Sequence, residues 1–217
     1  MQRACLQDIA DDLTHKRGYD VVIDFASGLP TQDHIHTVVK PGTLVIYSDI
    51  DPVVVEFAKE ILKGAPDTYI FQSDARHPET LLSNPQVLEL LQGRRDVALV
   101  LWGLSSFLND AELNTTMQAV YNWSGPRATM VFNAQGTDIN TNDPAVMQVM
   151  ALYERMGVKL HARTLSQHHD LVRPWRADEQ GFVSLLNWHG CDSTVMTPED
   201  LQMMGSAGGG YGAYLVK

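Results

Sequence analysis

The sequence predicts an α/β fold in which a doubly wound, mostly parallel sheet of seven strands carries helices on both faces and ends with an antiparallel C-terminal strand. Short apolar segments rich in β-branched residues recur at regular intervals along the chain. Most of them are continuously apolar, as expected of parallel strands that are covered on both faces. Segments with apolar residues at helical spacing lie between them, so the chain is a βαβ series with right-handed crossovers.

Seven segments are predicted to form the strands. They are residues 21–25, 43–47, 68–71, 96–101, 127–132, 192–196 and 211–217. Alternation of the first five with helices makes the sheet Rossmann-like, with a ligand crevice beyond the carboxyl ends of the strands. We therefore expect the functional residues in the loops that follow strands.

The helices are predicted at residues 1–17, 31–39, 52–63, 79–91, 110–122, 144–156 and 178–188. The helix at 52–63 has the most complete signals: Asp51 can cap its N-terminus, Pro52 stands at its first position and Gly64 follows its end. A polar stretch at 161–178 interrupts the pattern, and we expect it to form a cap or an insertion.

The composition argues against several classes of protein. The formal net charge is −10 at pH 7, and a surface poor in clustered Lys and Arg does not suit nucleic acid or anionic lipid. The longest apolar run, residues 97–108, is about half the roughly 20 residues that a spanning helix needs, so no membrane segment is expected. Because Cys5 and Cys191 show neither a disulfide framework nor metal-ligand spacing, we expect a reducing cytoplasm.

The loop after the first predicted strand is a turn of small residues, Ala26-Ser27-Gly28, preceded by Asp24. Such a turn lets the backbone approach a ligand. It contains one glycine, whereas a dinucleotide-binding loop has Gly-x-Gly-x-x-Gly, and the chain contains no Gly-x-x-x-x-Gly-Lys phosphate loop. The missing motifs therefore weaken the prediction that the ligand is a dinucleotide or a nucleoside triphosphate.

Acidic residues follow three successive strands at equal intervals, at Asp24, Asp49 and Asp74. An acid after the second strand can accept both hydroxyl hydrogens of a ribose, which makes Asp49 the predicted ribose ligand. Asp74 can accept from an adenine amine, although a turn residue would explain it too. Trp102, after the fourth strand, can cover the adenine, although core packing explains it equally well.

These motifs resemble those of class I methyltransferases that use S-adenosylmethionine. More narrowly, residues 3–6, 24–32, 49–52 and 74–76 resemble the poorly characterised S-adenosyl methyltransferase family, whose members share a Gly-Leu-Pro-Thr signature. The resemblance covers residues 3 to about 135 well and the rest loosely. It implies S-adenosyl-L-methionine as the cofactor and S-adenosyl-L-homocysteine as the product.

The resemblance also implies where the cofactor lies. Asp24, Ala26 and Gly28 would surround its methionine end, Asp49 its ribose, and Asp74 with Ala75 its adenine. The predicted cofactor-binding residues are Asp24, Ala26, Ser27, Gly28, Asp49, Ile50, Ser73, Asp74, Ala75, Trp102 and Gly103. The family usually has glycine at the position of Ala26, so this chain leaves the backbone less clearance there.

The length fits a single methyltransferase domain over residues 1–217. Within it we expect an N-terminal helix (1–17), a cofactor-binding half (18–135), a substrate or cap region (136–210) and a last strand (211–217). The candidates for a general base are His36, which matches a histidine of the family pattern, and His168 and His169 in the expected cap. No metal site is predicted, because the spacing of His189, Cys191 and Asp192 matches no familiar one.

Three functions remain open from the sequence. The first is methyl transfer to an oxygen, nitrogen or carbon of a small-molecule acceptor, without nucleic acid or membrane as partner. The second is an NAD(P)-dependent Rossmann oxidoreductase, which would share the acid after strand two but needs the absent glycine fingerprint. The third is a noncatalytic protein that binds a nucleoside. The oligomeric state is not predicted.

Overall fold

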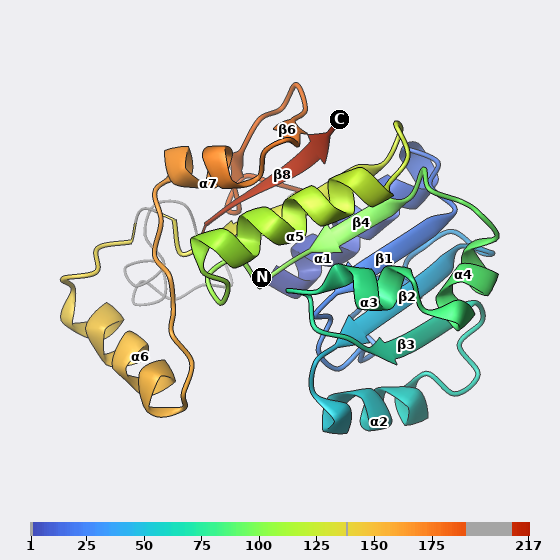
Figure 1. Cartoon of the computed structure of the whole chain (residues 1–217), viewed down its shortest axis with the longest axis horizontal. Helices are drawn as coiled ribbons and strands as arrows, with labels where there is room; N and C mark the ends of the chain where they lie inside the picture. The colour runs from blue at the N-terminus through green and yellow to red at the C-terminus, as the bar shows by residue number, and fades with distance from the viewer. Residues whose placement is uncertain (1, 138, 190–209) are drawn as a thin grey trace.

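The computed structural model describes residues 2–137, 139–189 and 210–217, which form a twisted sheet with helices on both faces (Figure 1). Eight strands belong to the sheet in this part of the chain, in the order β3-β2-β1-β4-β5-β8-β6, and β7 pairs with β8. Their bounds are Val21–Phe25 for β1, Leu44–Asp49 for β2, Thr68–Gln72 for β3, Ala98–Leu101 for β4, Thr129–Gln135 for β5, Arg176–Ala177 for β6, Val183–Ser184 for β7 and Gly210–Val216 for β8.

Strands β1 to β5 run parallel, and β8 is antiparallel to β5. This confirms the predicted fold class, since the last strand turns back as expected. Two strands of the described part of the chain, β6 and β7, were not predicted, because each is two residues long and carries too little pattern to be seen in a sequence. The strand predicted at 192–196 lies outside the described residues.

The helices lie where an apolar face can cover the sheet. Their bounds are Gln2–Asp11 for α1, Pro52–Ile61 for α2, Pro78–Leu82 for α3, Pro85–Leu91 for α4, Asp110–Trp123 for α5, Pro144–Arg155 for α6 and Leu165–Leu171 for α7, with the π-helix η1 at Asp12–Lys16 and the 3₁₀ helix η2 at Ile35–Thr37. α2 begins as predicted, because the side chain of Asp51 accepts a hydrogen bond from the backbone N–H of Val53 at 2.8 Å.

Successive residues of the buried strands point to opposite faces of the sheet and pack into two separate hydrophobic cores. Ile23, Phe25 and Leu101 point to the face covered by α3, α4 and α5. Val22 and Tyr47 point to the face covered by α1, η1 and α2. Because both faces are buried, the strands are continuously apolar, which is the pattern that predicted them.

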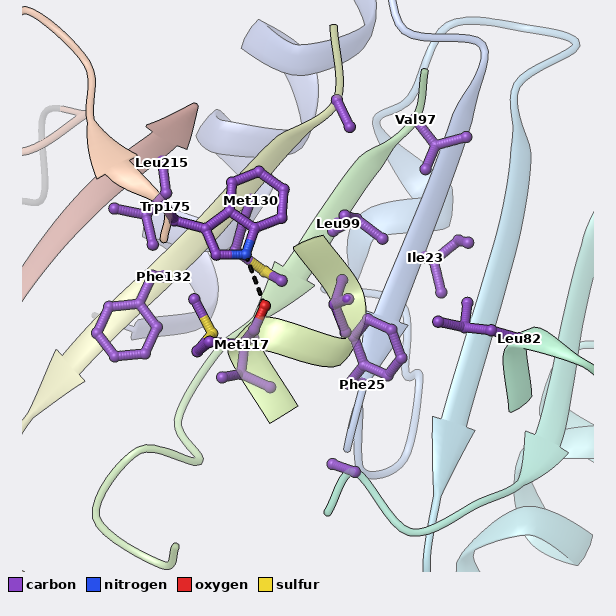
Figure 2. Packing of buried hydrophobic residues seen from close by; sticks show 14 of the residues in the cluster. Ile23, Phe25, Leu82, Val97, Leu99, Met117, Met130, Phe132, Trp175 and Leu215 are labelled. Atoms are coloured by element: carbon purple, nitrogen blue, oxygen red, sulfur yellow. Dashed lines mark hydrogen bonds between the residues drawn. The ribbon is translucent and has the colours of Figure 1, made fainter. Parts of the chain in front are cut away.

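The core on the face covered by α3, α4 and α5 extends beyond the predicted cofactor-binding half to the segment after α7. Figure 2 shows Trp175 packed between strands and α5, with its indole N–H donating to the carbonyl of Met117 at 2.9 Å. Burial of this aromatic ring and pairing of its polar atom attach the segment to the sheet. The predicted cap at 161–178 thus contributes α7 and part of the core.

Three predicted helices differ from the structure. The helix at 178–188 is wrong: Val183 pairs with Gly212 there, in β7. The helix at 79–91 is divided into α3 and α4, because Asn84 caps α4 and Pro85 disfavours a helical conformation at the residue before it. The helix at 31–39 is reduced to η2, where the backbone N–H of His36 donates to the hydroxyl of Tyr47 instead of a helical carbonyl.

α6 stands away from the sheet, joined to it by two extended connections (Figure 1). Val146 is its buried residue, while Met147, Leu152 and Met156 are exposed. The described helices include none that is long and apolar enough to cross a bilayer.

Candidate functional site

The candidate site lies where the strand order reverses, at the carboxyl ends of β1 and its neighbours β2 and β4. A parallel sheet opens a crevice at such a point, because the loops of the two halves leave in opposite directions. The carboxyl ends of β1 to β4 and the loops that follow them carry the predicted cofactor residues, so the topology brings together the segments that the sequence singled out.

The loop after β1 has a left-handed backbone at two positions. Ala26 has φ 62° and Gly28 has φ 65°, and between them the backbone N–H of Ser27 donates to the carbonyl of Ser48 at 2.8 Å. A Cβ built on Gly28 meets nothing within 4 Å, so the loop is open on that side. A left-handed backbone strains a residue that has a side chain, which explains why the family usually has glycine at the position of Ala26.

Replacing Ala26 with glycine is expected to raise the free energy of unfolding by about 0.5 to 1 kcal/mol. The strain relieved is about 1 to 2 kcal/mol, and the added freedom of glycine in the unfolded chain offsets about half of it. Urea unfolding measures the change. Ala145→Gly, at an exposed position of α6, is the control and should instead lose about 1 kcal/mol. Equal losses in the two variants would contradict the strain at Ala26.

Asp49 joins the first two loops of the site. Its Oδ2 accepts a hydrogen bond from the backbone N–H of Gly28, and its Oδ1 accepts one from the backbone N–H of Asp51, both at 2.9 Å. A carboxylate has about four acceptor positions, so two remain for a ligand. The role of Asp49 as ribose ligand stays a prediction, and the structure adds that it fixes the first loop. Ile50 beside it is 52% exposed.

Asp24 is buried at the end of β1, with 2% of its surface exposed. Its Oδ2 has no hydrogen-bond partner within the described part of the chain. Burial, and next to it the charge of Asp49, raise the pKa of Asp24 well above its usual value. A buried polar atom without a partner is uncommon and points to a ligand, a water or a proton at this place.

Asp74, after β3, holds a side chain of its own loop. Both of its carboxylate oxygens lie 2.9 Å from Nε of Arg76, and a guanidinium nitrogen lies 2.6 Å from Oδ2. The hydrogen bond from Arg76 is the main cause that lowers the pKa of Asp74. Nearby, the hydroxyls of Ser73 and Thr80 lie 2.8 Å apart. Ala75 is buried in the core. Arg76 therefore competes with any ligand for Asp74.

Trp102 follows β4 and is 9% exposed. It stacks on Trp188, with ring centroids 5.9 Å apart and an interplanar angle of 21°. Its indole N–H has no hydrogen-bond partner among the described residues. Gly103 follows with φ 68°. Trp188 was not predicted as a neighbour of Trp102, because residues 178–188 were expected to form a helix and no local signal links two tryptophans so far apart in the chain.

The three candidate bases are divided between the two faces of the sheet, with His36 on one face and His168 and His169 on the other. His36 is half-buried, with Nδ1 at 3.1 Å from the hydroxyl of Tyr47, and burial lowers its pKa. His168 is fully buried against Phe132 of the other core. His169 is exposed, with its ring 4.5 Å from that of Phe182. The structure therefore does not bring the three together, and each stays a separate prediction.

His168 should make the protein sensitive to acid. Burial, with the charge of Arg163 as a smaller cause, lowers its pKa to about 4. The unfolded chain binds this proton near pH 6.5 and the folded chain only near 4, so stability is complete above 6.5 and falls as the pH falls toward 4. Between pH 7 and pH 4 we expect roughly 3 kcal/mol of acid-dependent loss in the wild type that is missing in His168→Gln.

Urea unfolding of both proteins at several pH values from 4 to 7 measures this difference. His169→Gln, which changes the exposed neighbour, is the control and should follow the wild type. A His168→Gln variant with the pH dependence of the wild type would show that folding does not lower the pKa of His168.

Comparisons with known proteins agree with this architecture. A family model described as S-adenosyl methyltransferase matches residues 1–211. A candidate methyltransferase from Thermobifida fusca has 25% identity and a TM-score of 0.80, over 100% of this chain and 80% of that chain. A DUF574 family protein from Streptomyces avermitilis has 19% identity and a TM-score of 0.81, over 100% and 82%.

A human protein shares the fold over a part of its length. N-acetylserotonin methyltransferase in complex with S-adenosylmethionine has 14% identity and a TM-score of 0.58, over 100% of this chain and 52% of that chain. A search of the curated proteins gave no match.

Proposed function

The chain belongs to the S-adenosyl methyltransferase family, and we propose that it transfers the methyl group of S-adenosylmethionine to a small molecule. The family match over residues 1–211 carries the cofactor part of the proposal. The net charge of −10 supports a small acceptor over a nucleic acid, since phosphates would be repelled.

The residues of the site suit the proposed cofactor. S-adenosylmethionine, when bound, supplies an electrophilic methyl group on a positively charged sulfur. Asp24 offers a buried carboxyl group with an unpartnered oxygen at the end of β1. Gly28 leaves space beside the loop, and Asp49 retains acceptor positions next to it. A cationic nucleoside is the ligand that this combination of carboxylates and open backbone favours.

The protein's part in such a reaction is mainly to position the ligand and to exclude water. Where the acceptor must lose a proton, His36 is the candidate we favour for the base. Burial lowers its pKa, so the ring is neutral at neutral pH and can accept a proton. His168 is enclosed by the core, so an acceptor reaches it less easily.

Calorimetric titration with S-adenosylmethionine, S-adenosylhomocysteine and NAD tests the cofactor, and methyl transfer to a panel of small hydroxyl, amine and carbon acceptors tests the reaction. We expect both adenosyl compounds to bind and NAD to give no heat. Binding of NAD alone would favour the oxidoreductase. Cofactor binding with no acceptor methylated would favour the noncatalytic protein.

Replacing Asp49 with alanine is expected to weaken S-adenosylmethionine binding by about 1 to 3 kcal/mol, through lost charge-assisted hydrogen bonds. The first loop also loses its anchor, because the N–H of Gly28 loses its acceptor. Calorimetry measures the affinity. Asp51→Ala is the matched control: it removes the cap of α2 and should lower stability but leave affinity near that of the wild type. Unchanged affinity in Asp49→Ala would reject it as the ribose ligand.

A further inference from the structure

The carboxyl group of Asp24 has an environment that does not suit a negative charge. It lies at the end of β1 with 2% of its surface exposed, and its Oδ2 has no partner among the described residues. In the sheet it is flanked by Tyr47 of β2 and Val100 of β4. The valine offers no polar group. The tyrosine hydroxyl is already in contact with ring nitrogens of His34 and His36, each at 3.1 Å.

Among the described residues, the other groups on this face of the sheet do not supply a positive charge to this carboxyl. Burial, and next to it the charge of Asp49 at the end of β2, raise the pKa of Asp24. The helix α1 contributes apolar side chains to this face, including Leu6 and Ile9. The pKa of His36 is lowered by burial, which leaves its ring neutral at neutral pH.

We propose that Asp24 holds a proton in the ligand-free protein and releases it when the positively charged end of S-adenosylmethionine enters the site. This inference rests on the proposed function and concerns the proton balance of that same site. On release, the O–H bond of the carboxyl breaks, its electron pair stays on the carboxylate, and a buffer base takes the proton. The carboxylate then faces a positive charge that compensates the cost of its burial.

The release of a proton on binding fixes how the affinity for S-adenosylmethionine depends on pH. Where binding releases one proton, the affinity rises with pH, and it rises by up to tenfold per pH unit while Asp24 is protonated in the free protein. Acid therefore weakens binding although the ligand keeps its charge.

Calorimetric titration of the whole chain with S-adenosylmethionine at pH 6, in phosphate and in imidazole, two buffers that accept protons near this pH and differ in ionisation enthalpy, counts the released protons. At this pH the α-amino group of the ligand, with a pKa near 8, stays protonated and does not contribute. We expect the binding heats in the two buffers to differ by close to one proton per site, and the affinity to rise about tenfold from pH 5 to pH 6.

Two variants assign the proton. Asp24→Asn should bind with equal heats in both buffers, while Asp20→Asn, an exposed acid at the other end of β1, should behave as the wild type. Should Asp24→Asn not bind, carbon-13 NMR of aspartate carboxyls in the wild type gives the same answer, since one carboxyl should change from the protonated to the ionised shift on binding. Wild-type binding with equal heats in both buffers would overturn this inference alone. Absence of binding would overturn the proposed function and this inference with it.

Discussion

Replacing Arg163 with methionine is expected to lower the free energy of unfolding by about 3 to 5 kcal/mol. The side chain is 2% exposed and donates three hydrogen bonds, from Nε to Asp110 at 2.8 Å and from its two terminal nitrogens to the carbonyls of Ser105 and Leu108 at 2.6 Å. Methionine keeps the apolar stem but leaves two buried carbonyls without donors. Urea unfolding measures the loss.

The loss depends on burial rather than on the ion pair. Asp110 is 68% exposed, so its contact with Arg163 contributes little by itself. Arg127→Met is the matched control, because Arg127 is 85% exposed and also pairs with an aspartate, Asp96 at 3.1 Å. It should cost less than about 1 kcal/mol. A similar loss in the two variants would show that the carbonyls around Arg163 find other donors.

The second large effect is expected from Gly212→Ala, which should lower the free energy of unfolding by about 3 kcal/mol. Gly212 lies in β8, and a Cβ built on it would lie 1.9 Å from a ring carbon of Trp188. Either the indole leaves its place or the strand moves. Because Trp188 stacks on Trp102, the displacement should also reach the candidate site.

A double-mutant cycle identifies the cause. In the Trp188→Ala background the ring is gone, so Gly212→Ala should cost less than about 0.5 kcal/mol in urea unfolding. An undiminished cost in that background would mean that the β8 backbone, not the indole, excludes a side chain at this position.

Much of the fold could be predicted because its signals are local. Continuously apolar segments of the sequence predicted the five parallel strands, and Asp51 with Pro52 predicted the start of α2. Errors arose where distant contacts decide. Residues 178–188 have helical spacing, yet Val183 forms part of β7 and pairs with Gly212 of β8. The free edge of β8 offers this pairing, and a local sequence pattern does not show it.

The candidate site shows the same division. Strand ends placed Asp24, Asp49 and Asp74 along one edge of the sheet, as the sequence indicates, since parallel strands end on the same side. Their environments could not be predicted. Asp74 is paired with Arg76, two residues away, whereas Asp24 is buried without a partner for its Oδ2 among the described residues.

The sequence alone determined the five parallel strands, the start of α2, the turn that begins with Ala26 and the position of acids at strand ends. Only the tertiary structure decided which ionisable groups are buried, as with Asp24 and His168, and which rings meet, as with Trp102 and Trp188. The physical reason is range. Periodicity and capping depend on neighbours within a few residues, whereas desolvation and packing depend on every segment that folds against a side chain.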